Sequence, residues 1–350
     1  MKIGIPKEIK ILEGRVALIP EAAGELVRYG HHVAIQQSAG ILSGYSDADY
    51  HKAGVDILPD AKSIYDFAEL VIKVKEPQPA EFDLMRADQI LFSYLHLAAE
   101  PDLTKALQEI GITAIGFETV EHGHSLPLLA PMSDIAGRLS VQIGTNLLQR
   151  PNGGRGLLLG GLPAAERGKV IILGGGTAGS NAALMACNIG AEVTVFDPNR
   201  DKLASLRNLG DNVTGLYPFS HAIEEHVRQA DLLVGAVLIT GQRAPHLVSA
   251  ELVKQMKPGS VIIDISVDQG GCIETTRPTN YETPTFVWEE VVHFGVTNMP
   301  GAVPRTASQA LSAALLPYSL QLAAPGWEKM PDLASGVNVK GGRIIHPALQ

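Results

Sequence analysis

Apolar runs and segments with helical spacing alternate along the first third of the chain. Five apolar runs predict strands, at residues 2–6, 32–37, 68–74, 90–95 and 112–118. Two segments between them predict helices that end on a glycine, at residues 20–30 and 102–111. Strands that alternate with helices predict a mainly parallel sheet covered by helices on both faces.

The same alternation restarts after residue 131. Segment 133–149 opens with Ser133 and Asp134, a pair suited to cap a helix, and continues as a long amphipathic helix. A Gly- and Pro-rich stretch follows at residues 151–163. Further apolar runs then predict strands that begin at Lys169 and span 191–197, 231–238 and 260–267. The chain is therefore expected to be an α/β protein with two doubly wound domains.

The domain limits depend on an uncharged segment near the C-terminus. Residues 306–323 are expected to form a helix that returns to the first domain. The first domain then comprises residues 1–130 plus 304–350, and the second comprises residues 131–303. The alternative is two domains in a row. From Thr306 to Trp327 the chain has no charged residue and is long enough to span a bilayer, but this stretch contains several polar residues and two prolines, so we expect a buried helix and no membrane span.

Composition and charge limit which binding partners we expect. The chain has 350 residues, of which 45% are hydrophobic, and a formal net charge of −9 that argues against nucleic acid as a partner. The two cysteines form neither a disulfide framework nor a metal-ligand spacing, and we expect no metal site. The first ten residues lack the apolar core of a signal peptide, so we expect a cytoplasmic protein.

A glycine-rich turn follows the strand that begins at Lys169. Gly174, Gly176 and Gly179 form a G-x-G-x-x-G motif between a buried strand and a helix of small residues. Gly174 permits the tight turn, Gly176 lets a pyrophosphate approach the backbone, and Gly179 lets helix and strand pack closely. The helix N-terminus supplies N–H groups and a partial positive charge to the phosphates. This motif predicts a dinucleotide site in a Rossmann-like domain.

Asp197 ends the next strand, 18 residues beyond Gly179. That position matches the carboxylate that accepts a hydrogen bond from the ribose hydroxyl of NAD. A 2′-phosphate would be repelled by about 4 kcal/mol per charge pair at ~4 Å and an effective dielectric of ~20, close to a thousandfold in affinity. Asp197 therefore favours NAD over NADP, although the nearby Arg200 softens the repulsion.

Several long segments together resemble the alanine dehydrogenase family, which is related to the NAD-binding subunit of proton-translocating transhydrogenase. The matching segments run nearly end to end and include PKEIK (6–10), VIKVKEP (71–77), YLHLA (94–98), LPLLAPMSDIAGRLS (126–140), LGGGTAG (173–179), MKPGSVIIDISVDQGGCIETTRPT (256–279) and HFGVTNMPGAVPRTASQAL (293–311). The resemblance implies two Rossmann-like domains with a cleft between them, and a homohexamer.

The resemblance also implies a reversible, NAD-dependent oxidative deamination of L-alanine to pyruvate and ammonium. Arg15 and Lys75 match the substrate-binding positions, and a guanidinium beside an ammonium group suits a carboxylate. His96 matches the catalytic histidine, which must take and return protons near neutral pH. Asp268 matches a carboxylate that would steady the cationic intermediate and also contact the cofactor. Asp264 is expected to be a buried structural carboxylate.

Further cofactor contacts follow from the resemblance by position only. They are Ser133, Thr177, Ala178, Ser220, Val237, Leu238, Ile265, Val296 and Met299. Three segments depart from the family pattern, at residues 120–127, 239–245 and 286–294, and we expect them in or near loops.

Three other functions stay open at this point. The first is an NAD-binding component of a transhydrogenase, which would hand hydride to a partner protein. The second is a related amino-acid or imine oxidoreductase with a different substrate. The third is an NAD-binding protein without turnover. Turnover of NADH that needs both pyruvate and ammonium distinguishes the expected dehydrogenase from all three.

Overall fold

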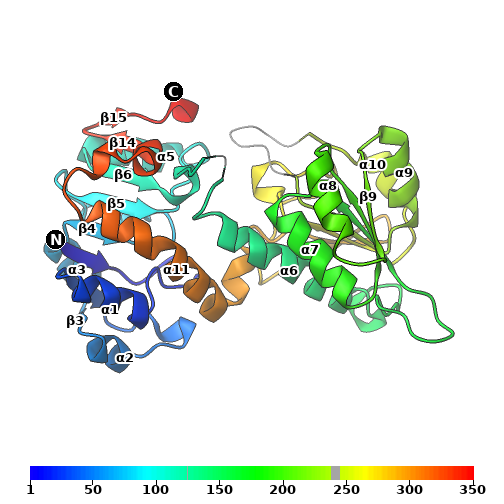
Figure 1. The fold of residues 1–350 in the computed structure, drawn as a ribbon, viewed down its shortest axis with the longest axis horizontal. Helices are drawn as coiled ribbons and strands as arrows, with labels where there is room; N and C mark the ends of the chain where they lie inside the picture. Colours follow the sequence, from blue (N-terminus) through cyan, green and yellow to red (C-terminus); the bar gives the residue numbers. More distant parts are fainter. Residues whose placement is uncertain (124, 238–244) are drawn as a thin grey trace. The chain divides into compact units, whose positions relative to one another are not determined.

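The computed structural model describes residues 1–123, 125–237 and 245–350. In these residues the chain forms two compact units (Figure 1). The first unit contains Met1–Met132 and Gly301–Gln350, and the second contains Ser133–Pro300. Each unit has its own sheet and its own buried apolar side chains.

The first unit is built on a sheet with the order β15-β14-β6-β5-β4-β1-β2-β3. Strands β6 to β3 in this order are parallel to one another, whereas β14 is antiparallel to β6 and to β15. The strands span Lys2–Ile5 (β1), His32–Gln36 (β2), Asp56–Leu58 (β3), Leu70–Ile72 (β4), Ile90–Ser93 (β5), Thr113–Gly116 (β6), Val337–Lys340 (β14) and Arg343–Ile344 (β15). Figure 1 shows β14, from the C-terminal part of the chain, beside β6.

Helices connect and cover these strands. The α-helices of the first unit span Pro20–Arg28 (α1), Asp47–Lys52 (α2), Ala61–Phe67 (α3), Pro79–Phe82 (α4), Pro101–Ile110 (α5), Pro304–Leu322 (α11) and Pro331–Ser335 (α12). Short 3-10 helices span Ile41–Ser43 (η1), Phe117–Thr119 (η2), Trp327–Lys329 (η6) and Pro347–Leu349 (η7). Helices α1 and α5 bury one apolar face each, which is the amphipathic arrangement that their sequence spacing predicts.

The second unit repeats the same parallel strand order. Its sheet has the order β12-β13-β11-β10-β7-β8-β9, and only β12 is antiparallel to its neighbour. The strands span Lys169–Leu173 (β7), Glu192–Phe196 (β8), Val213–Leu216 (β9), Leu232–Gly235 (β10), Val261–Asp264 (β11), Thr285–Trp288 (β12) and Val291–Phe294 (β13). The chain reverses its winding between β7 and β10, as it does between β1 and β4 in the first unit. Such a reversal opens a crevice at the carboxyl ends of the strands.

The helices of the second unit lie along this sheet in Figure 1. They span Ala130–Leu147 (α6, which starts in the first unit), Thr177–Asn188 (α7), Arg200–Arg207 (α8), Ser220–Gln229 (α9) and Ala250–Val253 (α10). Short 3-10 helices span Arg150–Asn152 (η3), Val267–Gln269 (η4) and Met299–Ala302 (η5).

The fold class predicted from the sequence is confirmed, with local differences. Helix α6 begins at Ala130, so Ser133 and Asp134 lie inside the helix and do not cap it. The segment 286–294 is mostly strand: β12 and β13 form a hairpin whose turn residues Glu289 and Glu290 have φ angles of 47° and 61°. Of the other two atypical segments, 120–123 and 125–127 lie outside helices and strands apart from an isolated bridge between His122 and Ser125, and residues 124 and 239–244 lie outside the described part of the chain.

Helix α11 contains the uncharged segment 306–323. Its buried serines bind the loop before α1: the Ser308 hydroxyl accepts from Val16 N at 2.9 Å, and the Ser312 hydroxyl accepts from Ile19 N at 2.9 Å. These polar contacts explain why the helix carries serines, and its packing on α1 places it in the first unit. No helix in the described residues is long and apolar enough to cross a membrane.

Replacing Ser312 with alanine is expected to lower the thermal stability of the protein. The Ser312 hydroxyl also donates to Ala17 O at 3.0 Å, so the substitution leaves a buried N–H and a buried carbonyl without their partner. Such a loss costs about 1–3 kcal/mol, or roughly 2–8 °C in Tm. Calorimetry on S312A measures the shift. The exposed Thr306 lies in the same helix, and T306A is expected to leave Tm nearly unchanged.

Candidate active site

The carboxyl edge of the first sheet brings three predicted site residues to one side of the unit. Arg15 lies in the loop after β1, Lys75 follows β4, and His96 follows β5. Strands β1, β4 and β5 are consecutive and parallel, so the loops after them leave the sheet at the same edge. The positive charge of Arg15 acts to lower the pKa of both Lys75 and Tyr94, and the Tyr94 ring stacks on His96.

Arg15 is buried in a two-point ion pair with Glu13. The Arg15 Nε donates to Glu13 Oε1 at 2.7 Å, and Nη2 donates to Glu13 Oε2 at 2.5 Å. Nη1 lies 3.1 Å from Met132 Sδ. A bidentate pair fixes the plane of a guanidinium. Glu13 therefore sets the direction in which Arg15 faces at the edge of the sheet.

The backbone of Lys75 is held by Glu8, and its ammonium group is not. Glu8 Oε1 accepts from Val74 N at 2.6 Å and from Lys75 N at 3.4 Å. Within the described residues, the Lys75 Nζ has no hydrogen bond or ion pair. Burial lowers the pKa of Lys75, and the positive charge of Arg15 lowers it further. Two cations thus lie near each other, and an anion bound there would relieve their repulsion.

Glu8, which holds the Lys75 backbone, belongs to a buried network of charged side chains. The fully buried Lys73 donates from Nζ to Glu81 Oε2 at 2.8 Å and lies 3.6 Å from Glu8 Oε2. The Tyr65 hydroxyl donates to Glu81 Oε1 at 3.0 Å. Glu8 Oε2 has no hydrogen-bond partner among the described residues. Burial raises the pKa of Glu8 to about 7, although Lys73 and the Val74 N–H oppose the shift.

His96 has an unusual backbone conformation. Its φ angle is 50°, in the left-handed region that non-glycine residues seldom occupy. Glu118, in η2 after β6, accepts from His96 N at 2.6 Å and from Leu95 N at 3.1 Å. The His96 ring lies nearly parallel to the Tyr94 ring, at 11° and 6.0 Å between centroids. The Tyr94 hydroxyl in turn donates to Leu128 O at 2.5 Å.

The second unit has a backbone cradle suited to a pyrophosphate. Gly174 has a φ of 99°, and a Cβ on Gly179 would lie 1.8 Å from Gly174 O, so only glycine fits the turn and the helix contact. A Cβ on Gly176 would meet nothing within 4 Å. The space beside Gly176 is thus open at the N-terminus of α7, where Thr177 and Ala178 begin the helix. These features fit a bound dinucleotide.

Asp197 lies at the end of β8 beside this cradle. It is buried, its Oδ2 accepts from Gly175 N at 2.8 Å, and its Oδ1 accepts from Asn199 N at 2.8 Å. The nearby cation is Lys202, whose Nζ lies 3.8 Å from Oδ2. The sequence had pointed to Arg200 instead. Each carboxylate oxygen accepts more than one hydrogen bond, so a ribose hydroxyl also fits.

The other predicted cofactor contacts lie around the same edge of the second sheet. Asn181 of α7 joins α6 to this edge, because its Nδ2 donates to Asp134 Oδ1 at 2.7 Å, and Asp134 is the neighbour of Ser133. Leu238 lies outside the described residues. The rest follow strand ends or begin a helix or 3-10 helix: Ser220, Val237, Ile265, Asp268, Val296 and Met299.

Asp268 lies in η4, in a loop that the buried Asp264 holds. Asp264 Oδ1 accepts from Ser266 N at 3.0 Å, and Oδ2 accepts from Cys272 N at 3.1 Å and from the Thr276 hydroxyl at 2.8 Å. Burial raises the pKa of Asp264. As the sequence predicts, Asp264 is a buried structural carboxylate: it fixes both ends of the loop that carries Asp268.

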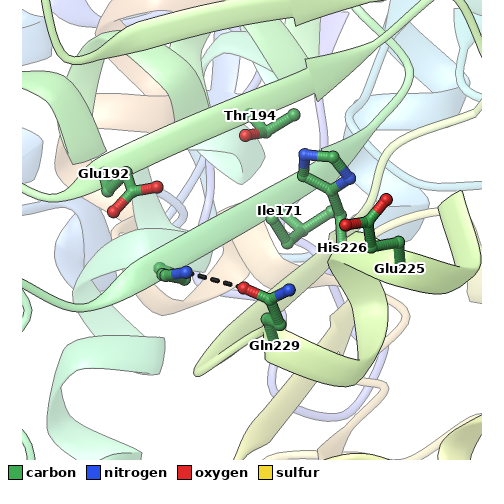
Figure 2. Close-up of a pocket in the computed structure, with 7 residues that line it drawn as sticks. Ile171, Glu192, Thr194, Glu225, His226 and Gln229 are labelled. Atoms are coloured by element: carbon green, nitrogen blue, oxygen red, sulfur yellow. Dashed lines mark hydrogen bonds between the residues drawn. The ribbon is translucent and has the colours of Figure 1, made fainter. Parts of the chain in front are cut away.

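A small polar pocket of about 160 Å³ lies elsewhere on the second sheet (Figure 2). Lys169 and Glu192, the first residues of β7 and β8, line it together with His226 and Gln229 of α9. The Lys169 Nζ donates to Gln229 Oε1 at 2.7 Å, which is the dashed bond in Figure 2. This pocket lies toward the amino ends of the strands, opposite the edge with Gly174 and Asp197, and it contains none of the predicted site residues.

Comparisons with known proteins match nearly the whole chain. Residues 4–136 match the profile described as "Alanine dehydrogenase/PNT, N-terminal domain", and residues 140–347 match "Alanine dehydrogenase/PNT, C-terminal domain". The chain belongs to the alanine dehydrogenase/PNT family. Membership in this family implies a pyridine nucleotide cofactor and a small-molecule substrate.

Individual relatives match over nearly their full length. The chain is 48% identical to an alanine dehydrogenase of Bacillus subtilis and 50% identical to one of Geobacillus stearothermophilus, covering all of this chain and 94% and 95% of those proteins. A solved structure titled "L-alanine dehydrogenase" is 54% identical, with a TM-score of 0.97, and the match covers all of this chain and 98% of that one. A transhydrogenase from Sinorhizobium meliloti, at 24% identity and a TM-score of 0.86 over 99% of this chain and all of that one, shares the fold.

The sequence prediction missed the glutamates that hold the site residues. Glu8, Glu13 and Glu118 contact the backbone or side chain of Lys75, Arg15 and His96. Glu8 and Glu13 lie in the loop that contains Arg15, so the loop's acidic content was a visible signal. Glu118 lies 22 residues from His96, and only the pairing of β5 with β6 brings the two together.

The buried Glu8 is expected to make the stability of the protein depend on pH. Its pKa is about 7 in the folded chain against an ordinary 4.5, so the folded state holds a proton that the unfolded state releases. The stabilisation is present below pH 4.5 and is lost as pH rises through about 7, on the order of 3 kcal/mol. In E8Q, the free energy of unfolding relative to wild type should therefore increase between pH 5 and pH 8, as measured by urea denaturation.

The exposed Glu121 provides the matched control, because E121Q removes a carboxylate that is not buried. The difference between E121Q and wild type should stay constant over the same pH range. An E8Q curve that runs parallel to wild type would show that Glu8 does not titrate differently in the folded state.

Proposed function

We propose that this protein catalyses the reversible, NAD-dependent oxidative deamination of L-alanine to pyruvate and ammonium. One observation carries the proposal: the Lys75 ammonium group has no polar partner among the described residues and lies near the buried Arg15. Two adjacent cations at the carboxyl edge of a parallel sheet suit the carboxylate of an amino or keto acid. The named relatives support alanine as that amino acid.

Each site residue has a chemical task in this reaction. Arg15 and Lys75 bind the substrate carboxylate and orient the Cα–H bond. When bound at the turn of Gly174 and Gly176, NAD would supply the acceptor for the hydride that leaves Cα; loss of that hydride converts alanine to iminopyruvate. His96 takes a proton from the water that attacks the imine carbon and returns it to the departing ammonia. Asp268 steadies the positive charge of the imine.

The carboxylate of Asp197 supports NAD rather than NADP as the cofactor. Its buried position at the end of β8 places a negative charge beside the backbone cradle of Gly174 and Gly176. We assign substrate binding to residues 1–130 plus 304–350 and NAD binding to residues 131–303. We also propose that the protein assembles as a homohexamer, which the family resemblance supports. Mass measurement of the purified protein tests the assembly.

The test of the activity is NADH absorbance in the purified protein with pyruvate and ammonium. We expect NADH to be lost only when both are present, because the reverse reaction needs an imine formed from the two. Mixtures without ammonium or without pyruvate are the controls. Turnover with glyoxylate but not pyruvate would assign a different substrate. NADH binding without any turnover would favour a hydride-transferring component or a binding protein.

Removing the charge of Asp197 is expected to relax cofactor choice. In D197N, the preference for NADH over NADPH, measured as the ratio of kcat/KM values, should fall by about a hundredfold to a thousandfold, because the repulsion of a 2′-phosphate is lost. Asp201 is exposed on α8, close in sequence to Asp197, and D201N is the matched control that should keep the wild-type ratio. An unchanged ratio in D197N would contradict the assignment of Asp197 to the ribose.

A further inference from the structure

The end of β5 is the most constrained strand end in the first unit. Strand β5 ends at Ser93, and Glu118 accepts hydrogen bonds from two residues beyond this end. Leu95 N donates to its two oxygens at 3.1 and 3.2 Å, and His96 N donates to it at 2.6 Å. One side chain thus satisfies two successive backbone N–H groups. A carboxylate does this well, because it carries only acceptors.

The same residues force His96 out of the extended conformation. With φ at 50°, the chain turns at His96, and His96 O accepts from Ala99 N at 2.9 Å. A non-glycine residue in the left-handed region costs free energy and persists only where neighbouring contacts impose that conformation. The N–H bond to Glu118 and the carbonyl bond to Ala99 are the contacts that do so here.

The imidazole itself has little else to fix it. In the part of the chain that the structure describes, the His96 ring makes no hydrogen bond, and its recorded contact is the stacking on Tyr94. The direction of the ring therefore follows from the backbone turn and from Tyr94. A change of backbone at His96 would move the ring, even though Glu118 makes no recorded contact with it.

A second carboxylate shows that this is a repeated device. Glu8 accepts from Val74 N and Lys75 N at the end of β4, as Glu118 accepts from Leu95 N and His96 N at the end of β5. In both cases the second N–H belongs to the residue with a proposed role in the reaction. The difference is that Lys75 has a long, flexible side chain, whereas the position of the shorter His96 ring depends closely on its backbone.

We propose that Glu118 is a positioning residue for His96: its carboxylate holds the Leu95–His96 backbone in the left-handed turn and so keeps the imidazole where it exchanges protons with the substrate. This role rests on the proposed function. It predicts a defect in turnover rather than in substrate binding, because the hydrogen bonds of Glu118 hold Leu95 and His96.

The test is E118Q, with turnover and a spectrum as separate readouts. Glutamine removes the charge, which weakens the bond from His96 N to Oε1, and it places an NH2 group where Oε2 accepts from Leu95 N, so that second contact is lost. We expect kcat for pyruvate amination to fall about tenfold to a hundredfold. KM for pyruvate should change less than about threefold, since its binding groups are intact. H96A provides the reference for complete loss of the histidine.

The spectrum is the backbone amide signal of His96 in protein labelled with nitrogen-15 at histidine. The short bond from His96 N to Glu118 should place this proton downfield, and the signal should move upfield in E118Q. E121Q makes the same chemical change three residues away at an exposed position and should change neither kcat nor the signal. E118D keeps the charge with a shorter reach and should give an intermediate kcat and an intermediate signal.

The outcomes separate the positioning role from the proposed function. An E118Q variant with wild-type kcat, or an unmoved His96 signal, would overturn the role of Glu118. If E118Q fails to fold, E118D decides, and a wild-type kcat and signal in E118D would overturn it. A wild-type protein without turnover of pyruvate and ammonium would instead contradict the proposed function, while the His96 signal would still report whether Glu118 holds the turn.

Discussion

The first unit depends on how the backbone N–H groups beyond its parallel strands are satisfied. A strand that ends at the edge of a sheet leaves N–H groups that the neighbouring strand no longer pairs, and burying them unpaired is costly. Here carboxylates supply the acceptors: Glu8 beyond β4 and Glu118 beyond β5. Because one carboxylate oxygen accepts more than one hydrogen bond, each glutamate holds two successive residues.

This solution places several charges in a small buried volume. Lys73 lies fully buried between Glu8 and Glu81, and Arg15 is paired with Glu13. Burying ions costs free energy that their attraction only partly offsets, which is why the pKa of Glu8 rises to about 7. The network is therefore poorly explained as a device for stability. It is well explained as a rigid support for Arg15 and Lys75, the cations proposed to bind the substrate.

The two units combine one strand order with two different loops. Each has a central strand, β1 or β7, at which the winding reverses, and each carries an antiparallel strand beyond its last parallel one. The difference lies in the loop after the central strand. After β7 the chain turns at once through Gly174 into α7, which exposes helix N–H groups to phosphates. After β1 a long loop runs to α1 and carries Arg15, whose guanidinium suits a small carboxylate, together with Glu13 and Glu8, which hold Arg15 and the backbone of Lys75.

The sequence by itself determined the strand and helix pattern, the G-x-G-x-x-G turn and the residues with a proposed part in the chemistry. These are local properties: periodicity follows from which face is buried, and only glycine tolerates the φ of Gly174 and the packing at Gly179. Segment 286–294 escaped prediction as a hairpin, because its turn uses two glutamates in the left-handed region where glycine or asparagine is usual. Only the tertiary structure decided which carboxylates hold which residues. Glu118 meets His96 across 22 residues because β5 and β6 pair in a fixed register, and such a contact leaves no periodic trace in the chain.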